Sequence, residues 1–341
     1  MDTPASDPLR PGLARARQLL RPACLAHLLA CSPDAALIEV GCGRVADFEQ
    51  AHIPGAAYLD TSVLEGPPYF NKVDDDALHA LLLQYAIGHD TTVLLYGRNS
   101  LAAARAAHLM LYAGVADVRL LDGGFGAWCA AGLPCSGGSG RALVGIEAFG
   151  LPFPACPHYL AWASDVAAIS ADGGATLVSV RTWREFSGAT SGYAYIAARG
   201  EIPGARWGRA GREGDINSMS HYQLADGCML PAVQITRMWR AGGIEPSGPV
   251  VFYCGTGWRA SLAFFYAWLM GWERIAVYDG GWCEWSANAD NPVVRRLAAR
   301  GAAGLVAGAR AEPAPVGRLR QRQRAPEKVE PDPVFGPQST A

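Results

Sequence analysis

The chain repeats itself, and this repeat constrains its fold more than any other feature of the sequence. The first half contains the blocks LIEV at 37–40, HIPGA at 52–56, VLLYG at 93–97 and LDGGFGAW at 121–128. The second half contains LVSV at 177–180, EIPGA at 201–205, VVFYC at 250–254 and YDGGWCEW at 278–285. Gly97 and Asp122 are 25 positions apart, and so are Cys254 and Asp279. Two copies of one domain explain this shared order and spacing.

A glycine- and serine-rich stretch separates the two copies. It reads SGGSG at 136–140, a composition typical of flexible linkers. We therefore expect a first domain at 16–136, a linker at 137–155 and a second domain at 156–292. The remaining residues, 293–341, are rich in alanine, glycine and proline and contain nine basic and four acidic residues. Because this composition cannot bury a core, we expect it to form a disordered basic tail.

Short apolar strands alternate with helical segments in each copy. Residues 177–180 and 250–253 are continuous β-favouring runs, typical of strands that are buried on both faces. Residues 260–270 form an apolar segment of helical length that ends before Gly271. This alternation predicts two α/β domains, each a mainly parallel sheet flanked by helices on both faces. Functional residues in such sheets gather at the carboxyl ends of the strands.

The overall composition argues against several classes of protein. A net charge of −2 over 341 residues is not typical of a nucleic-acid binder or of a membrane-surface protein. No run of about 18 apolar residues is present, so we expect no membrane-spanning helix. Arginines interrupt the apolar segment 13–30, so this segment makes a poor signal peptide. We therefore expect a cytoplasmic protein, in which the cysteines are reduced. The nine cysteines form no Cys-x-x-Cys pair, and we therefore expect no metal site.

One loop between a predicted strand and a predicted helix carries the residues with the clearest chemistry. It reads CGTGWR at 254–259. Gly255 and Gly257 allow the backbone to turn its N–H groups inward, and the first turn of the following helix adds further unpaired N–H groups. Arg259 contributes a full positive charge. Such a set of donors favours the thiolate of Cys254, which is then a nucleophile.

This loop and the repeated blocks resemble the rhodanese family. The resemblance is carried by the Cys-x-x-Gly-x-Arg loop, the two IPGA blocks and the two DGG blocks. The duplication is similar to the tandem-domain members of that family, the thiosulfate and 3-mercaptopyruvate sulfurtransferases. The segment TSGY at 190–193 and the CGTGWR loop are similar to a bacterial thiosulfate sulfurtransferase branch.

The resemblance implies a two-step sulfur transfer that needs no metal or organic cofactor. The Cys254 thiolate takes the outer sulfur of thiosulfate and releases sulfite, and the resulting persulfide then passes its sulfur to an acceptor. The acceptor is a small thiol, a thiol protein such as thioredoxin, or cyanide in an assay. The residues expected to bind the donor and the persulfide are Gly255, Thr256, Gly257, Trp258 and Arg259.

A second cation is expected at the same edge of the sheet. Arg181 directly follows the strand at 177–180 and matches the family position at which an arginine binds the anionic part of the donor. The alternative is an ion pair between Arg181 and Glu185 on the following turn. In the first copy, Gly97 replaces the cysteine and Gly41 replaces this arginine, so that domain is expected to be non-catalytic.

Three neighbours of the loop have more than one interpretation. Trp258 walls the substrate pocket, contacts an acceptor protein or packs against the first domain. Asp279 has a twin, Asp122, in the inactive copy, which favours a turn or capping role over that of a base. Cys283 is either a resolving thiol or a packing residue.

Loop length argues against a phosphatase. Cysteine phosphatases place the arginine one position further from the nucleophile, where this chain has Ala260. The shorter loop favours sulfur over phosphate. Three alternatives to thiosulfate transfer remain open: a 3-mercaptopyruvate sulfurtransferase, a relay that carries sulfur from a cysteine desulfurase to a biosynthetic carrier, and a non-catalytic binding protein.

Overall fold

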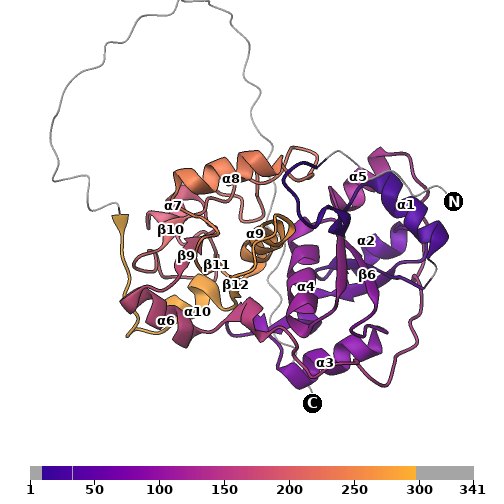
Figure 1. The fold of residues 1–341 in the computed structure, drawn as a ribbon, viewed down its shortest axis with the longest axis horizontal. Helices are drawn as coiled ribbons and strands as arrows, with labels where there is room; N and C mark the ends of the chain where they lie inside the picture. Colours follow the sequence, from indigo (N-terminus) through magenta and orange to yellow (C-terminus); the bar gives the residue numbers. More distant parts are fainter. Residues whose placement is uncertain (1–9, 33, 297–341) are drawn as a thin grey trace, which may run out of the picture. The chain divides into compact units, whose positions relative to one another are not determined.

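The computed structural model describes residues 10–32 and 34–296, which contain two five-stranded parallel sheets (Figure 1). The first has the order β1-β7-β6-β2-β3, with β1 at Leu19–Leu20, β2 at Ala36–Gly41, β3 at Ala57–Asp60, β6 at Thr92–Tyr96 and β7 at Asp117–Leu121. The second has the order β8-β12-β11-β9-β10, with β8 at Leu160–Ala161, β9 at Thr176–Ser179, β10 at Arg206–Trp207, β11 at Val250–Tyr253 and β12 at Ile275–Tyr278. The two orders correspond strand for strand, which confirms the predicted α/β repeat.

Helices connect the strands in both copies. In the first they are α1 (Pro22–Cys31), α2 (Val45–Gln50), α3 (Asp75–Gln84), α4 (Ser100–Ala113) and α5 (Gly124–Ala130). In the second they are α6 (Ala163–Asp172), α7 (Trp183–Phe186), α8 (Ala232–Ala241), α9 (Trp258–Leu269) and α10 (Gly281–Ala287). The first copy also has a small antiparallel hairpin, β4 (Glu65–Gly66) with β5 (Asn71–Lys72). None of the helices that the structure describes is long and apolar enough to cross a membrane.

Both faces of each sheet are buried, because successive side chains of a strand point to opposite faces. In β2, Ile38 packs into a cluster with residues of α4. The next residue toward the N-terminus, Leu37, packs into a separate cluster with Leu25 of α1 and Phe48 of α2. Helices therefore cover both faces, as the continuous apolar strands predict.

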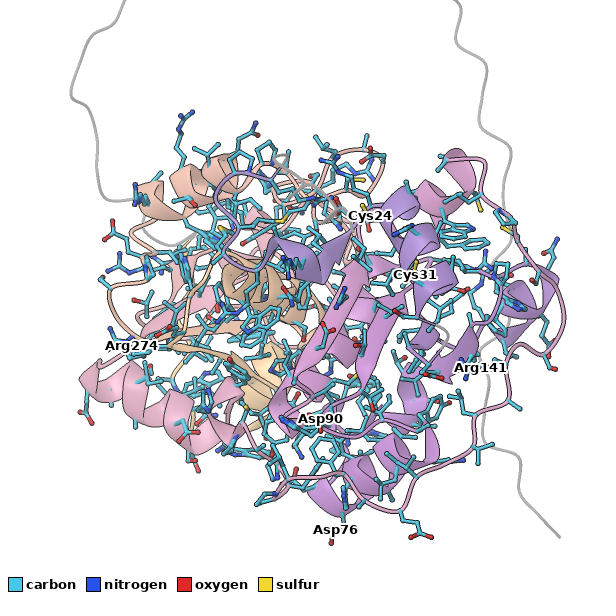
Figure 2. All side chains as sticks on the ribbon, turned by 45° about the vertical axis from the view of Figure 1, so that its right-hand side comes forward. Cys24, Cys31, Asp76, Asp90, Arg141 and Arg274 are labelled. Carbon is cyan, nitrogen blue, oxygen red and sulfur yellow. The ribbon has the colours of Figure 1, made fainter. Side chains whose placement is uncertain are left out.

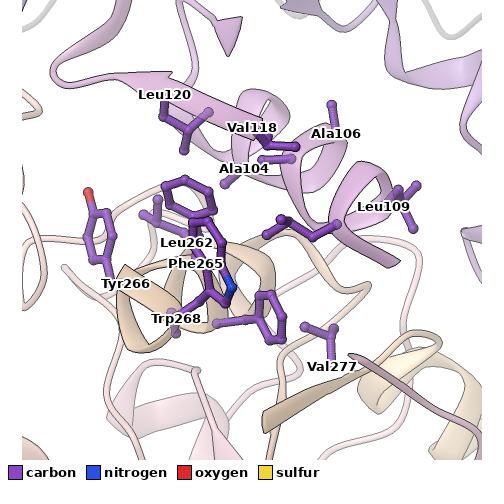
Figure 3. Packing of buried hydrophobic residues seen from close by; sticks show 14 of the residues in the cluster. Ala104, Ala106, Leu109, Val118, Leu120, Leu262, Phe265, Tyr266, Trp268 and Val277 are labelled. Atoms are coloured by element: carbon purple, nitrogen blue, oxygen red, sulfur yellow. The ribbon is translucent and has the colours of Figure 1, made fainter. Parts of the chain in front are cut away.

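The two domains share one core, which is centred on the adjacent helices α4 and α9 (Figure 1). Residues 101–113 of α4 and 259–269 of α9 are all buried. Small residues of α4, such as Ala104, and large ones of α9, such as Phe265 and Trp268, belong to this one core (Figure 3). Helices that are buried all round form the centre of a large core, so the two copies fold against each other as one unit.

The segments predicted as linker and tail contact the domains where the structure describes them. Within 137–155, the N–H of Ile146 donates to a carbonyl of α3. At the start of the predicted tail, Val294 exchanges two backbone hydrogen bonds with Glu201 of the second domain. The rest of that tail, 297–341, lies outside the described residues.

Candidate active site

Cys254 and Arg181 lie at the carboxyl edge of the second sheet. Cys254 follows β11, and Arg181 closely follows β9, the strand that pairs with β11. The N–H of Val180 donates to the carbonyl of Tyr253 at 2.7 Å, which extends the pairing to the residues just before both side chains. The structure therefore brings the two predicted residues to one edge, as parallel strands require.

The backbone after Cys254 presents a row of unpaired donors. Gly257, with φ at 92°, stands at the N-cap of α9, and no side chain caps that helix. Within the described chain, no acceptor takes a hydrogen bond from the backbone N–H groups of 255–260, whereas the N–H of Ser261 donates to the Gly257 carbonyl at 2.8 Å. We call the N–H groups of 255–260 the anion cradle. Together with the helix dipole they favour a negative charge at the loop.

The loop is held from its other side by the start of α10, the helix that follows β12. The N–H of Trp282 donates to the Cys254 carbonyl at 2.8 Å, and the N–H of Cys283 donates to the Gly255 carbonyl at 2.9 Å. A side chain on Gly255 has no room, because its Cβ would lie 2.2–2.4 Å from the ring of Tyr193. These contacts fix the carbonyls and leave the anion cradle free of protein acceptors.

Arg259 does not extend freely into the loop. Its side chain is 1% exposed and forms two hydrogen bonds to the carboxylate of Glu185, at 2.8 and 2.9 Å, and one to the hydroxyl of Tyr193, at 2.7 Å. Burial by itself raises the pKa of Glu185, but Arg259 and Arg181 lower it to about 2. Glu185 is therefore ionised at neutral pH and offsets part of the charge that Arg259 brings to Cys254.

Arg181 is also paired and fully buried. Its Nε lies 3.7 Å from Glu185, the pairing given above as the alternative to donor binding. Its Nη1 donates to the carbonyl of Gly200 at 2.8 Å and to the carboxylate of Glu201 at 3.3 Å. Burial raises the pKa of Glu201 despite the opposing effect of Arg181. Two arginines and two carboxylates thus form one buried network beneath the loop.

Two tyrosines, Tyr193 and Tyr195, lie near Cys254, which has no exposed surface. Tyr193 packs on Gly255, and the ring of Tyr195 lies 5.4 Å from it and 5.4 Å from the ring of Phe70 in the first domain. Burial raises the pKa of Tyr195 to about 12, and its hydroxyl interacts with the side chain of Thr256. Because Cys254 has no exposed surface, a donor reaches the thiol only when neighbouring groups move.

Other cysteines of the chain are more accessible than Cys254. Cys24 and Cys31, for example, are exposed on α1 of the first domain (Figure 2). Neither follows a strand and precedes a helix N-terminus, so neither has an anion cradle. Its place between a strand and a helix N-terminus, rather than exposure, distinguishes Cys254.

The first domain contacts the loop directly. The indole N–H of Trp258 donates to Glu65 of the β4–β5 hairpin at 2.5 Å, so this side chain packs against the first domain. Asp279 accepts the backbone N–H of Lys72 at 2.6 Å and lies 2.5 Å from Arg105 of α4. Asp279, which lies in the bend after β12, is thus also a contact between the domains.

A family model described as "Rhodanese-like domain" matches the chain twice, at residues 25–131 and 163–288. The chain belongs to the rhodanese family. The two matches confirm the resemblance drawn from the repeated blocks and the CGTGWR loop. The second match contains the whole anion cradle, so the loop is that of a rhodanese domain.

Several rhodanese relatives are similar over most of this chain. YnjE of Escherichia coli (strain K12), named a thiosulfate sulfurtransferase, is 49% identical over 75% of this chain, which spans 59% of the length of YnjE. SseB of Mycobacterium tuberculosis (strain ATCC 25618 / H37Rv), named a putative thiosulfate sulfurtransferase, is 28% identical over 84% of this chain and 99% of its own. The crystal structure of YnjE matches with a TM-score of 0.80 at 46% identity, covering 83% of this chain and 69% of that chain. An anaerobic ergothioneine biosynthesis enzyme from Chlorobium limicola, solved with trimethyl histidine, matches with a TM-score of 0.78 at 34% identity, covering 83% and 71%.

The first rhodanese domain lacks both the thiol and the space for it. A Cβ on Gly97, the twin of Cys254, would lie 2.7 Å from the carbonyl oxygen of Asn99. A Cβ on Gly41, the counterpart of Arg181, would lie 2.3 Å from the hydroxyl of Tyr58. Backbone carbonyls at Gly97 and the side chain of Tyr58 at Gly41 therefore occupy the space that a larger residue would need.

Sequence reasoning missed the contributions of Glu65 and Arg105. Arg105 is a charged residue inside an otherwise apolar run, LAAARAAHLM at 101–110, and its twin in the second rhodanese domain is Leu262. A charge in a buried helical stretch requires a partner, and this was the available signal. Glu65 lies outside the repeated blocks and carried no signal.

Proposed function

We propose that this protein is a thiosulfate sulfurtransferase that carries a sulfane sulfur as a persulfide on Cys254. The observation that carries the proposal is that Cys254 lies between β11 and the anion cradle, whose N–H groups stand at the N-terminus of a helix that no side chain caps. The names of YnjE and SseB support thiosulfate as the donor. The alternative functions are those of a 3-mercaptopyruvate sulfurtransferase, a persulfide relay and a non-catalytic binding protein.

The reaction needs only groups of the chain and the two substrates. The Cys254 thiolate attacks the outer sulfur of thiosulfate, the sulfur–sulfur bond of the donor breaks, and sulfite leaves with the electron pair. The terminal sulfur of the new persulfide is an anion, which the anion cradle stabilises by hydrogen bonds. An acceptor thiolate then attacks this sulfur, and the electron pair returns to Cys254.

The roles of the individual cradle residues follow from their contacts. The backbone N–H groups of Gly255, Thr256, Gly257, Trp258 and Arg259 bind the donor and then the persulfide. The guanidinium groups of Arg259 and Arg181 add positive charge below the cradle, which favours a dianionic donor. Both guanidinium groups already pair with buried carboxylates, so neither is free to bind the carboxylate of 3-mercaptopyruvate. This favours thiosulfate over 3-mercaptopyruvate as the donor.

The acceptor is proposed to be a thiol, either a small one or that of a protein such as thioredoxin. A second acceptor class is favoured by the similarity to EanB, which matches with a TM-score of 0.78 at 33% identity over 83% of this chain and 71% of that chain, and whose solved structures include a cysteine persulfide with ergothioneine. Variants of EanB at a threonine and at a tyrosine were solved with hercynine or ergothioneine. Here Thr256 and Tyr195 lie beside Cys254, so an imidazole acceptor is a second candidate.

Intact-mass measurement after incubation with thiosulfate tests the proposal. We expect a gain of one sulfur atom, its removal by cyanide or a thiol, and no gain in Cys254→Ser. Cys283→Ser, which changes the adjacent thiol, serves as the control and is expected to gain sulfur normally. Sulfur uptake that persists in Cys254→Ser, or is absent from the unmodified protein, would overturn the proposal. Adding trimethyl histidine in place of the thiol distinguishes the second acceptor class.

A further inference from the structure

Arg105 of the first domain lies against the loop of the second. Its side chain is fully buried, and a Cβ built on Gly257 would lie 3.2 Å from its Nη1. This Nη1 has no hydrogen-bond partner among the described residues. The guanidinium therefore fills the space over the glycine at which the loop turns into α9.

The same guanidinium connects two segments that shape the loop. Its Nε donates to Glu65 at 2.9 Å, and the other oxygen of Glu65 accepts the indole N–H of Trp258. Its Nη2 lies 2.5 Å from Asp279. Asp279 lies two residues before α10. At the start of α10, the N–H groups of Trp282 and Cys283 donate to the loop carbonyls. Arg105 thus reaches both the C-terminal end of the loop and the turn beneath its N-terminal end.

We propose that Arg105 is a positioning residue for Cys254, through which the non-catalytic domain holds the anion cradle in shape. This inference rests on the proposed function of Cys254. Arg105 acts through Glu65 and Asp279 rather than by touching the thiol. Without Arg105, two buried carboxylates would lose their countercharge beside a loop that must bind a dianion.

The chain contains a matched control for this arrangement. Asp122, the twin of Asp279, accepts the backbone N–H of Met229 at 2.7 Å and pairs with Arg10 at 2.5 Å. The hydrogen bond from Met229 crosses the same interface, whereas the ion pair joins two residues of the N-terminal half, beside the loop that begins at Gly97. Arg10→Met therefore removes the cation paired with the twin aspartate and leaves Arg105, Glu65 and Asp279 in place.

The test compares the rates at which iodoacetate and iodoacetamide modify Cys254, followed by peptide mass spectrometry. The two reagents are similar in size, but only iodoacetate is an anion, so their rate ratio measures attraction to the cradle independently of access. Arg105→Met is expected to lower this ratio about tenfold and kcat with thiosulfate about 10- to 100-fold. Arg10→Met is expected to leave both unchanged. An unchanged ratio in Arg105→Met, or an equal loss in Arg10→Met, would overturn the inference.

Arg105→Lys provides a second variant should Arg105→Met fail to fold. Lysine keeps the positive charge but cannot bridge two carboxylates with a planar fork. We expect it to preserve the ratio and to lower kcat less than methionine does, and a wild-type kcat would contradict the positioning role. Alkylation needs no sulfur donor. Suppose that iodoacetate modifies wild-type Cys254 faster than iodoacetamide does, that Arg105→Met lowers this ratio, and that the wild type takes no sulfur from thiosulfate. The proposed function then fails, but the role of Arg105 in shaping the anion cradle stands.

Discussion

The carboxylate of Asp279 accepts a hydrogen bond from the backbone N–H of Lys72, at 2.6 Å, across the boundary between the two domains. Its twin Asp122 accepts the N–H of Met229 in the opposite direction, at 2.7 Å. The two copies therefore meet through a self-complementary contact, like that of a two-fold dimer. Each domain anchors a loop of the other, and the Cys254 loop is built at this shared boundary.

Gly255→Ala is expected to lower kcat/KM with thiosulfate about 100-fold, because the new Cβ meets the ring of Tyr193 and displaces the loop. Steady-state kinetics checks this. Gly248→Ala is the control, because a Cβ there has no heavy atom within 4 Å. Near-normal activity in Gly255→Ala would show that the loop tolerates movement away from Tyr193.

Glu185→Gln is expected to destabilise the fold by about 3–5 kcal/mol at neutral pH, because it leaves Arg259 buried without a full countercharge. Denaturant unfolding measures the change. The pKa of Glu185 in the folded chain, about 2, lies below its ordinary value of 4.5, so its contribution is present above about pH 4.5 and is lost as pH falls toward 2. The difference in unfolding free energy between the wild type and Glu185→Gln should therefore shrink as pH falls from 4.5 toward 2. A difference that shrinks only at high pH would contradict this prediction.

His108 gives a separate pH window. Burial and the neighbouring Arg105 lower its pKa from 6.5 to about 4, and its Nε2 lies 2.9 Å from the Tyr159 carbonyl. Because the unfolded chain takes up this proton first, stability should fall by up to about 3 kcal/mol between pH 6.5 and 4. His108→Gln can keep the bond to Tyr159 without titrating, so its stability should be flatter over this range. Parallel curves for the variant and the wild type would refute the prediction.

Gly97→Cys is expected not to create a second sulfur carrier. Its Cβ would lie 2.7 Å from the Asn99 carbonyl and 2.9 Å from that of Val40, so we expect a stability loss of about 1–3 kcal/mol from overpacking. Intact mass after thiosulfate should still show one added sulfur per chain. Two added sulfurs would mean that the first domain retains a working cradle.

Much of the fold and the centre of the site could be predicted from local sequence. The matched blocks gave two copies, the apolar runs at 177–180 and 250–253 marked strands buried on both faces, and the structure has parallel strands there. The glycines after Cys254 predicted an open backbone loop, and its N–H groups are indeed unpaired within the described chain. These features depend on residues that are neighbours along the chain.

The partners of the buried charges were decided only by the tertiary structure. Sequence placed Arg259 beside the thiol, but its pairing with Glu185 and Tyr193 depends on how α7 and the following segment fold over the loop. Likewise, Arg105 meets Asp279 only because α4 packs beside α9. Backbone conformation follows from a few adjacent residues, whereas the partner of a buried charge is whichever group packing brings within hydrogen-bond reach.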